Sequence, residues 1–166
     1  MNLDLPGVNA RFDHVAFAAP SLRDLVPIYR DLLGGRFYRG GDNARVGFRA
    51  VQYQYANGGR VELLEPLPKS TFFDAFFEKT GGGGPHHVTF VVDDMHRAVE
   101  AIQRSAYTAV GVFLDLPEWQ EVFLHPKETC GVLIQLVATD GTPPGKTSLE
   151  EVLAGNGEYG TGVPSA

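Results

Sequence analysis

The sequence predicts an α+β fold made of two copies of one βαβββ module. The main observation is a repeat: residues 12–17 (FDHVAF) return as residues 85–90 (PHHVTF), and residues 61–64 (VELL) return as residues 134–137 (IQLV). Both pairs lie 73 residues apart, as the steps from His14 to His87 and from Glu62 to Gln135 show. Each copy also runs from an alternating apolar segment through a helical one into further alternating segments. We expect the two modules to pair into a curved sheet that forms a cup.

The length of 166 residues and the apolar fraction of 43% are enough to bury the core of one globular domain. Within that domain we expect four segments. The first module covers residues 11–68, a connecting helix and glycine-rich joint residues 69–84, the second module residues 85–138, and a C-terminal tail residues 139–166.

The first module begins with a strand over residues 12–18. A helix with apolar positions at helical spacing follows, capped by Ser21 or Asp24 and ended by Gly34 and Gly35. Pro27 is tolerated only near the first turn of a helix, which favours a start closer to Asp24. Three strands complete the module, at residues 36–39, 46–55 and 60–65, with a turn at residues 57–59.

The connecting segment contains four phenylalanines at helical spacing after the potential cap Ser70, which indicates a short packing helix. After the glycines at 81–84, the module order returns. We expect a strand at residues 86–92, a helix capped by Asp94, and strands at residues 109–114, 121–124 and 132–138. A short helix up to Ala154 starts at Thr147 or Ser148, with Glu150 or Glu151 completing a capping box. The last ten residues are expected to be loose.

The composition favours a small molecule as partner. The net charge is −6, and no dense cluster of Lys or Arg is present, which argues against nucleic acid or an anionic membrane. The single cysteine, Cys130, excludes an internal disulfide. Because the sequence shows neither a leader peptide nor an apolar run of membrane-spanning length, we expect a cytoplasmic protein.

Four polar side chains at equivalent places of the repeat are candidate metal ligands: His14, Glu62, His87 and Gln135. Alternation along each strand turns them away from the helix of their module, toward the cup. Two imidazoles, a carboxylate and an amide oxygen suit Co, Ni, Zn, Mn or Fe as a divalent ion, with positions left open for substrate. A lone strand histidine is usually structural, but two at equivalent places favour metal binding.

Other polar residues receive weaker assignments. Gln52 and Gln54 share one face of a central strand and are candidate substrate contacts, although simple surface polarity explains them equally well. His86, His96 and His125 are expected to be structural. Three glutamates are expected to be solvated charges: Glu65, Glu118 and Glu121.

The chain resembles the vicinal oxygen chelate superfamily, which contains the glyoxalases, the bleomycin resistance proteins and ring-cleaving dioxygenases. Within it the chain is most similar to the methylmalonyl-CoA epimerases. The resemblance spans residues 11–138 and rests on the repeated strands, on Asp93 and Asp94, and above all on FLHPK (123–127) followed by GVLIQL (131–136). It implies the glyoxalase-like fold and a homodimer.

The resemblance also implies metal ligands at His14, Glu62, His87 and Gln135. In the epimerases the fourth of these positions is typically Glu, a leading candidate for the base that removes the proton next to the thioester carbonyl. An amide cannot accept that proton, so the family mechanism does not transfer unchanged to Gln135. Since Glu62 and Gln135 are equivalent in the repeat, our hypothesis is that Glu62 is both ligand and base.

The resemblance therefore implies a divalent-metal-dependent isomerase or lyase that acts through a metal-stabilised enolate, most sharply an acyl-CoA (methylmalonyl-CoA-like) epimerase. Candidate phosphate contacts are few and scattered: Lys127, Arg45 and Arg49. Three alternatives remain: a glyoxalase-type lyase, an extradiol-type dioxygenase, and a non-catalytic small-molecule-binding protein of the same fold.

Overall fold

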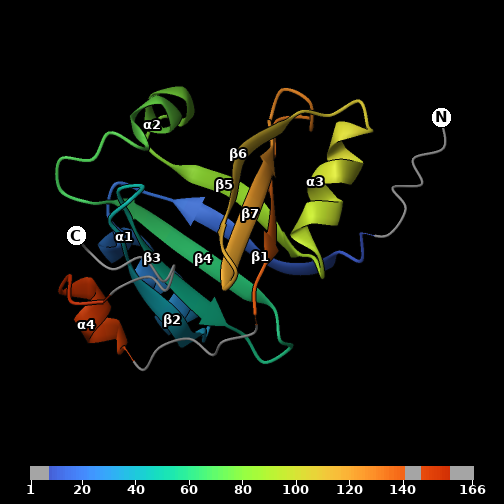
Figure 1. The fold of residues 1–166 in the computed structure, drawn as a ribbon. Coiled ribbons are helices and arrows are strands. Elements are labelled where there is room, and N and C mark those ends of the chain that lie inside the picture. Colours follow the sequence, from blue (N-terminus) through green and yellow to red (C-terminus); the bar gives the residue numbers. More distant parts are fainter. Residues whose placement is uncertain (1–7, 141–146, 158–166) are drawn as a thin grey trace. The chain divides into compact units, whose positions relative to one another are not determined.

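The computed structural model describes residues 8–140 and 147–157, and over these ranges the chain is an α+β structure (Figure 1). Its elements in chain order are β1 (Arg11–Ala18), α1 (Leu22–Val26), the π-helix η1 (Pro27–Leu32), β2 (Arg36–Asn43), β3 (Phe48–Gln54), β4 (Arg60–Pro66), α2 (Asp74–Thr80), β5 (Gly84–Val91), α3 (Met95–Gln103), β6 (Ala109–Leu116), β7 (Trp119–Leu124), β8 (Leu133–Ala138) and α4 (Leu149–Leu153). The predicted βαβββ order therefore occurs twice.

The repeat in the sequence is also a repeat in the structure. Four pairs of corresponding elements begin 73 residues apart: β1 with β5, α1 with α3, β2 with β6, and β4 with β8. Two backbone hydrogen bonds correspond as well, since Ala19 N–H donates to the Leu64 carbonyl over 3.0 Å and Val92 N–H donates to the Val137 carbonyl over 2.8 Å. The two copies thus share local geometry as well as sequence pattern.

Hydrogen bonding orders the eight strands as β2-β3-β4-β1-β5-β8-β7-β6. From either outer edge inward, each copy therefore has its second, third, fourth and first strand in that order. The pairs β2–β3, β3–β4, β6–β7 and β7–β8 are antiparallel, whereas β5 and β8 are parallel. The parallel pairing sets Thr89 opposite Gln135, so two polar side chains of different strands become neighbours on one face.

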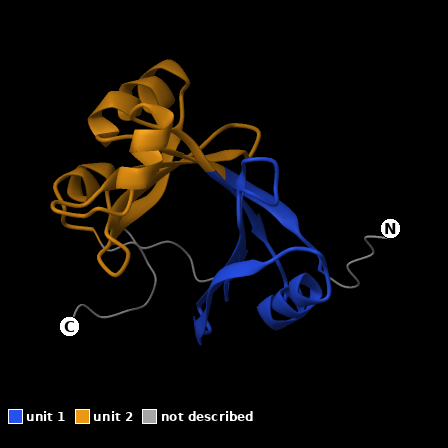
Figure 2. Cartoon of the chain, turned by 90° about the horizontal axis from the view of Figure 1, so that it is seen from above, with its two compact units in different colours: residues 1–14, 87–142 blue, residues 15–86, 143–166 orange. Residues whose placement is uncertain are grey.

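The chain divides into two compact units (Figure 2). Unit 1 contains residues 1–14 and 87–142, and unit 2 contains residues 15–86 and 143–166. The division falls inside β1, directly after His14, and inside β5, directly before His87. The module bounds at residues 68, 84 and 138 follow the repeat rather than compactness, and they stay a prediction.

In unit 2, the two faces of the sheet carry different clusters of apolar side chains. Val51 and Leu63 belong to the cluster that contains the buried residues of α1 and α4. Ala50 and Leu64 belong to a second cluster, which contains Phe73 in place of those helix residues. Because successive residues of a strand point to opposite faces, Glu62 lies on the face away from α1, as the alternation predicts.

In unit 1, α3 covers one face of the sheet. Its buried side chains form a cluster with Val122 of β7 and Leu136 of β8: Met95, Ala98 and Ile102. Gln135 precedes Leu136 and therefore points to the opposite face. This orientation also agrees with the alternation in the sequence.

The predicted start of the first helix near Asp24 is wrong. The helix begins directly after Ser21, whose side chain accepts a backbone N–H bond of the first turn. Pro27 instead lies where the α-helix becomes a π-helix, and there Leu33 N–H donates to the Ile28 carbonyl, five residues back. Proline interrupts regular helical bonding, and the change of helix type places that interruption at a junction.

Other element boundaries also differ from the prediction. Ser70 does not cap α2, which begins at Asp74. The hydroxyl of Ser70 instead accepts a hydrogen bond from Phe72 N–H in the preceding turn. Phe73 is buried, whereas Phe72 is 46% exposed. β2 and β7 are longer than predicted. The capping box of α4 is confirmed with Ser148 and Glu151. Residues 158–166, most of the end expected to be loose, lie outside the described ranges.

Tyr53 generates a prediction about stability. Its side chain is fully buried, and its hydroxyl has no hydrogen-bond partner among the described residues. A buried hydroxyl without a partner loses its bonds to water, so Tyr53→Phe should raise the free energy of unfolding by about 1 kcal/mol at neutral pH. Chemical denaturation monitored by circular dichroism measures this change, and a destabilised variant would contradict it.

Stability at alkaline pH provides a second comparison of Tyr53→Phe with the unchanged protein. Burial raises the pKa of Tyr53 to about 12 from its usual 10.0. In the unfolded chain the phenol loses its proton at a lower pH than in the folded protein. The free energy of unfolding therefore falls as the pH rises from about 10 to about 12. The loss should be smaller in Tyr53→Phe than in the unchanged protein.

Candidate metal centre

Two histidines face each other in unit 1. His14 lies on β1 and His87 on β5, at equivalent positions of the repeat. Their side chains are only 2% and 8% exposed, and the ring centroids are 5.7 Å apart with the planes inclined by 68°. A buried pair of imidazoles at this separation is suited to binding one metal ion.

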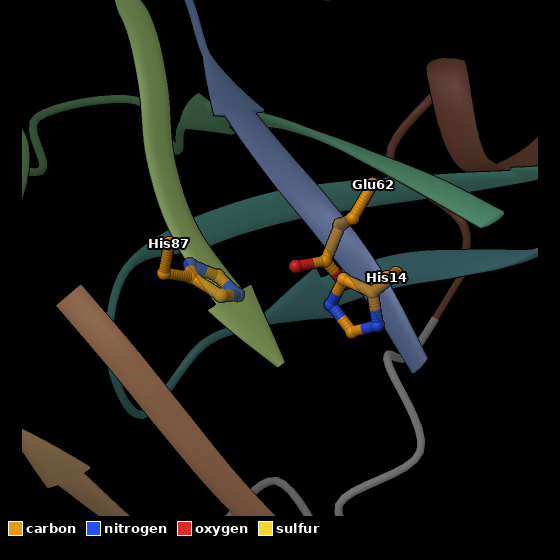
Figure 3. A group of neighbouring side chains, drawn as sticks. All are labelled: His14, Glu62 and His87. Atoms are coloured by element: carbon orange, nitrogen blue, oxygen red, sulfur yellow. The ribbon is translucent and has the colours of Figure 1, made fainter. Parts of the chain in front are cut away.

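Glu62 of β4 completes a group of three with these histidines (Figure 3). Each residue offers one ligand atom, and these atoms all lie within 4.8 Å of one another. Glu62 is 4% exposed. Burying a carboxylate is costly unless its charge is compensated, and a divalent cation between the three side chains would provide that compensation.

Asp13 supports His14 from the next position along β1. Its Oδ2 atom lies 2.7 Å from His14 Nδ1. When Nδ1 donates its proton to this carboxylate, Nε2 is left as the lone-pair atom of the ring. Histidine ligands of metals commonly have such a carboxylate partner, which fixes the ring and makes it a stronger donor.

Gln52 and Arg39 hold the carboxylate of Glu62 within unit 2. Gln52 is fully buried opposite Glu62 in the β3–β4 register, and its Nε2 donates to Glu62 Oε1 over 2.9 Å. Arg39 Nε donates to Gln52 Oε1 over 3.1 Å. Because arginine only donates, this bond requires the amide oxygen of Gln52 to face Arg39 and its NH₂ group to face Glu62.

Gln135 lies in unit 1 and is 7% exposed. Thr89 Oγ1 donates to Gln135 Oε1 over 2.7 Å, and the same hydroxyl lies 3.1 Å from His14 Nε2. The hydroxyl therefore touches two of the predicted ligand atoms. Thr89 was missed in the sequence although it stands two residues after His87, so its place on the same strand face was a usable signal.

The remaining predicted residues lie in different surroundings. Gln54, at the end of β3, and Lys127, in the turn after β7, are exposed. Their roles as substrate contacts stay predictions, as does that of Gln52. His96 is exposed on α3. His86 lies against the rings of three phenylalanines, which agrees with the structural role expected for it.

The residues present fit a divalent cation. Two imidazoles and one carboxylate are a donor set used for Fe, Co, Ni, Mn and Zn. The amide oxygen of Gln135 is a further possible donor.

Comparisons with known proteins show which families this chain is similar to. The family model of the Glyoxalase/Bleomycin resistance protein/Dioxygenase superfamily matches residues 13–112. Human mitochondrial methylmalonyl-CoA epimerase is 29% identical over 128 residues, which cover 76% of this chain and 72% of the relative. The ethylmalonyl-CoA/methylmalonyl-CoA epimerase of Cereibacter sphaeroides is 30% identical over 129 residues, which cover 76% of this chain and 96% of the relative.

A solved structure of a methylmalonyl-CoA epimerase is also similar to this chain. A variant of Streptomyces coelicolor methylmalonyl-CoA epimerase in complex with 2-nitronate-propionyl-CoA has a TM-score of 0.67 at 25% identity. The similarity covers 79% of this chain and 98% of that one. It confirms the predicted glyoxalase-like fold of paired βαβββ modules. The chain belongs to the glyoxalase/bleomycin resistance protein/dioxygenase superfamily.

Proposed function

We propose that this chain is a divalent-metal-dependent acyl-CoA epimerase that inverts the carbon next to a thioester carbonyl through an enolate. The observation that carries the proposal is the buried group of His14, Glu62 and His87 in a chain 30% identical to an ethylmalonyl-CoA/methylmalonyl-CoA epimerase. Members of one superfamily differ in reaction, so the site and these relatives together support the assignment.

The proposed ligands are His14, Glu62, His87 and Gln135. A divalent ion bound there would polarise the carbonyl oxygen and stabilise the negative charge of the enolate. Co, Ni, Zn, Mn and Fe all remain candidates. His14 is held by Asp13 and Gln135 by Thr89, so two of the donors are oriented before any ion arrives.

Glu62 is the proposed base. Its carboxylate takes the proton from the carbon next to the carbonyl, and the electron pair of that bond moves into the carbonyl group. A water molecule on the opposite face then supplies the proton that gives the inverted product, and Glu62 releases its own proton to the solvent. Gln135 cannot perform this step, because an amide does not accept a proton at neutral pH. Gln52 donates to one carboxylate oxygen of Glu62 and so holds the proposed base in a fixed orientation.

The substrate proposed is a branched acyl-CoA of the methylmalonyl-CoA type. The names of the relatives and the acyl-CoA analogue in the Streptomyces structure support this class. Arg49, one of the cations considered for the CoA phosphates, is 14% exposed and already pairs with Asp42 and Glu65. These carboxylates, Asp42 first, raise the pKa of Arg49. Its charge is therefore used within the fold.

Assembly and location stay predictions. We expect a homodimer, no nucleic-acid partner and no membrane partner, and a cytoplasmic location. Within residues 8–140 and 147–157, none of the helices combines the length and apolar character needed to cross a membrane.

Metal binding is the first test. The unchanged protein should bind about one divalent ion per chain. A chelator that removes this ion should abolish its conversion of one epimer of an acyl-CoA into the other. His14→Ala should bind the ion at least ~10-fold more weakly, because one donor is missing, whereas His96→Ala should bind it normally. Calorimetric titration with Zn²⁺ and elemental analysis provide the measurements. A protein that binds no divalent ion would contradict the proposed centre.

The role of Glu62 is tested by solvent exchange. Glu62→Gln preserves the size of the side chain but cannot accept a proton, so exchange of the substrate α-proton with deuterated water should fall by ~10²–10⁴-fold. Glu78→Gln, an exposed position on α2, serves as the matched control. If Glu62→Gln retains its metal and exchanges at the normal rate, Glu62 is not the base.

Gln52 should affect the exchange rate by orienting the carboxylate of Glu62. Gln52→Leu removes the donor to Glu62 Oε1 and should lower the exchange rate by ~10-fold while the metal stays bound, since the carboxylate loses its fixed orientation. Gln103→Leu makes the same chemical change at an exposed position of α3. Exchange equal to that of the control variant would argue against this orienting role.

A further inference from the structure

Gln135 has a polar partner at each end of its amide. Thr89 on β5 donates to the oxygen, as described above. On the other side, Gln135 Nε2 donates to Glu121 Oε2 of β7 over 2.8 Å. Glu121 was expected to be a solvated charge, but the structure places it half-buried against a predicted metal ligand.

The carboxylate of Glu121 fixes which way the amide points. An ionised carboxylate can only accept hydrogen bonds, so the amide atom that faces it must be the NH₂ group. The amide oxygen consequently faces the opposite way, toward Thr89, whose hydroxyl also lies 3.1 Å from His14 Nε2. The orientation suited to a metal ligand is thus set by the partner on the far side of the amide.

Trp119 holds Glu121 in turn. Its indole Nε1 donates to the same Oε2 atom over 3.2 Å, and its side chain is only 8% exposed. Trp119 is also the single tryptophan of the sequence. All of these residues lie in unit 1, so a continuous series of contacts runs within one compact unit from Trp119 through Glu121, Gln135 and Thr89 to His14.

A carboxylate also stands behind the other oriented ligand of this unit. Asp13 accepts from the ring nitrogen of His14 that faces away from the site, just as Glu121 accepts from the amide nitrogen of Gln135. Withdrawing an N–H proton toward a negative charge shifts electron density to the ligand atom, which strengthens a neutral donor. This effect matters most at Gln135, because an uncharged amide attracts a cation less than a carboxylate does.

We propose that Glu121 is a positioning residue of the metal centre, which orients and polarises the amide of Gln135 so that its oxygen acts as a ligand. The same contacts make Trp119 a built-in reporter of whether the ion is bound. This inference rests on the proposed function only in requiring that the chain binds a divalent ion. It does not depend on the substrate or on Glu62 being the base.

The test compares Zn²⁺ binding by the full-length unchanged protein, Glu121→Gln and Glu121→Leu. The glutamine variant keeps the size of the side chain and an accepting oxygen but loses the charge, whereas the leucine variant loses both. We expect Zn²⁺ dissociation constants raised by ~10-fold in the first and by up to ~100-fold in the second. Glu100→Gln, an exposed carboxylate on α3, should bind Zn²⁺ as the unchanged protein does.

Fluorescence supplies a readout that a purely structural role would not change. Zn²⁺ has a filled d shell and no redox chemistry, so any change in tryptophan emission on its addition comes from the surroundings of Trp119. We expect a saturable change in the unchanged protein, with the same midpoint as the calorimetric titration. In Glu121→Leu the change should be lost even at Zn²⁺ concentrations that saturate the site.

The outcomes separate the two proposals. If both Glu121 variants show the same dissociation constants and emission changes as the unchanged protein, Glu121 is not a positioning residue. The proposed metal centre would stand in that case. An unchanged protein that binds no Zn²⁺, Co²⁺ or Ni²⁺ would overturn both. If thermal unfolding shows Glu121→Leu to be unstable without metal, Glu121→Gln decides the matter, since it preserves side-chain volume.

Discussion

The burial of the Glu62 carboxylate is the constraint around which the site is organised. Glu62 is only 4% exposed, so its carboxylate loses contact with water, and interactions within the protein must replace the lost hydration. Gln52 supplies one hydrogen bond, and the two imidazoles form with the carboxylate a group that could hold a cation. The buried carboxylate, the hydrogen bond from Gln52 and the neighbouring imidazoles therefore form one electrostatic arrangement.

Each compact unit orients its own donors with internal hydrogen bonds. In unit 2, Arg39 and Gln52 orient Glu62. In unit 1, a carboxylate contacts each of two candidate ligands, Asp13 at His14 and Glu121 at Gln135. Rigid donors bind an ion more tightly than mobile ones because less side-chain freedom is lost on binding. The equivalent residues Glu62 and Gln135 are thus oriented differently, because Glu62 accepts a hydrogen bond from the amide of Gln52 whereas Gln135 donates one to the carboxylate of Glu121.

Much of the fold followed from local patterns. The repeat at 73 residues predicted two copies of one module, and the starts of four pairs of elements obey it. Boundaries were less accurate where a single residue competes with the pattern. Pro27 indicated a later helix start, but the chain accommodates it by changing helix type. Ser70 had the chemistry of a cap and was used in a turn instead.

The candidate ligands could be named from the residues alone, because spacing within a repeat and alternation along a strand are local properties of the chain. The partners of those ligands could not be named with the same assurance. Gln135 meets Glu121 because β7 pairs with β8 in one particular register, and that register depends on packing against α3 and on irregular pairing with β6. A shift of one residue would turn a different side chain toward the amide. No local pattern encodes the pairing of strands that are distant in the sequence. The orientation of the candidate ligands is therefore decided by the tertiary structure.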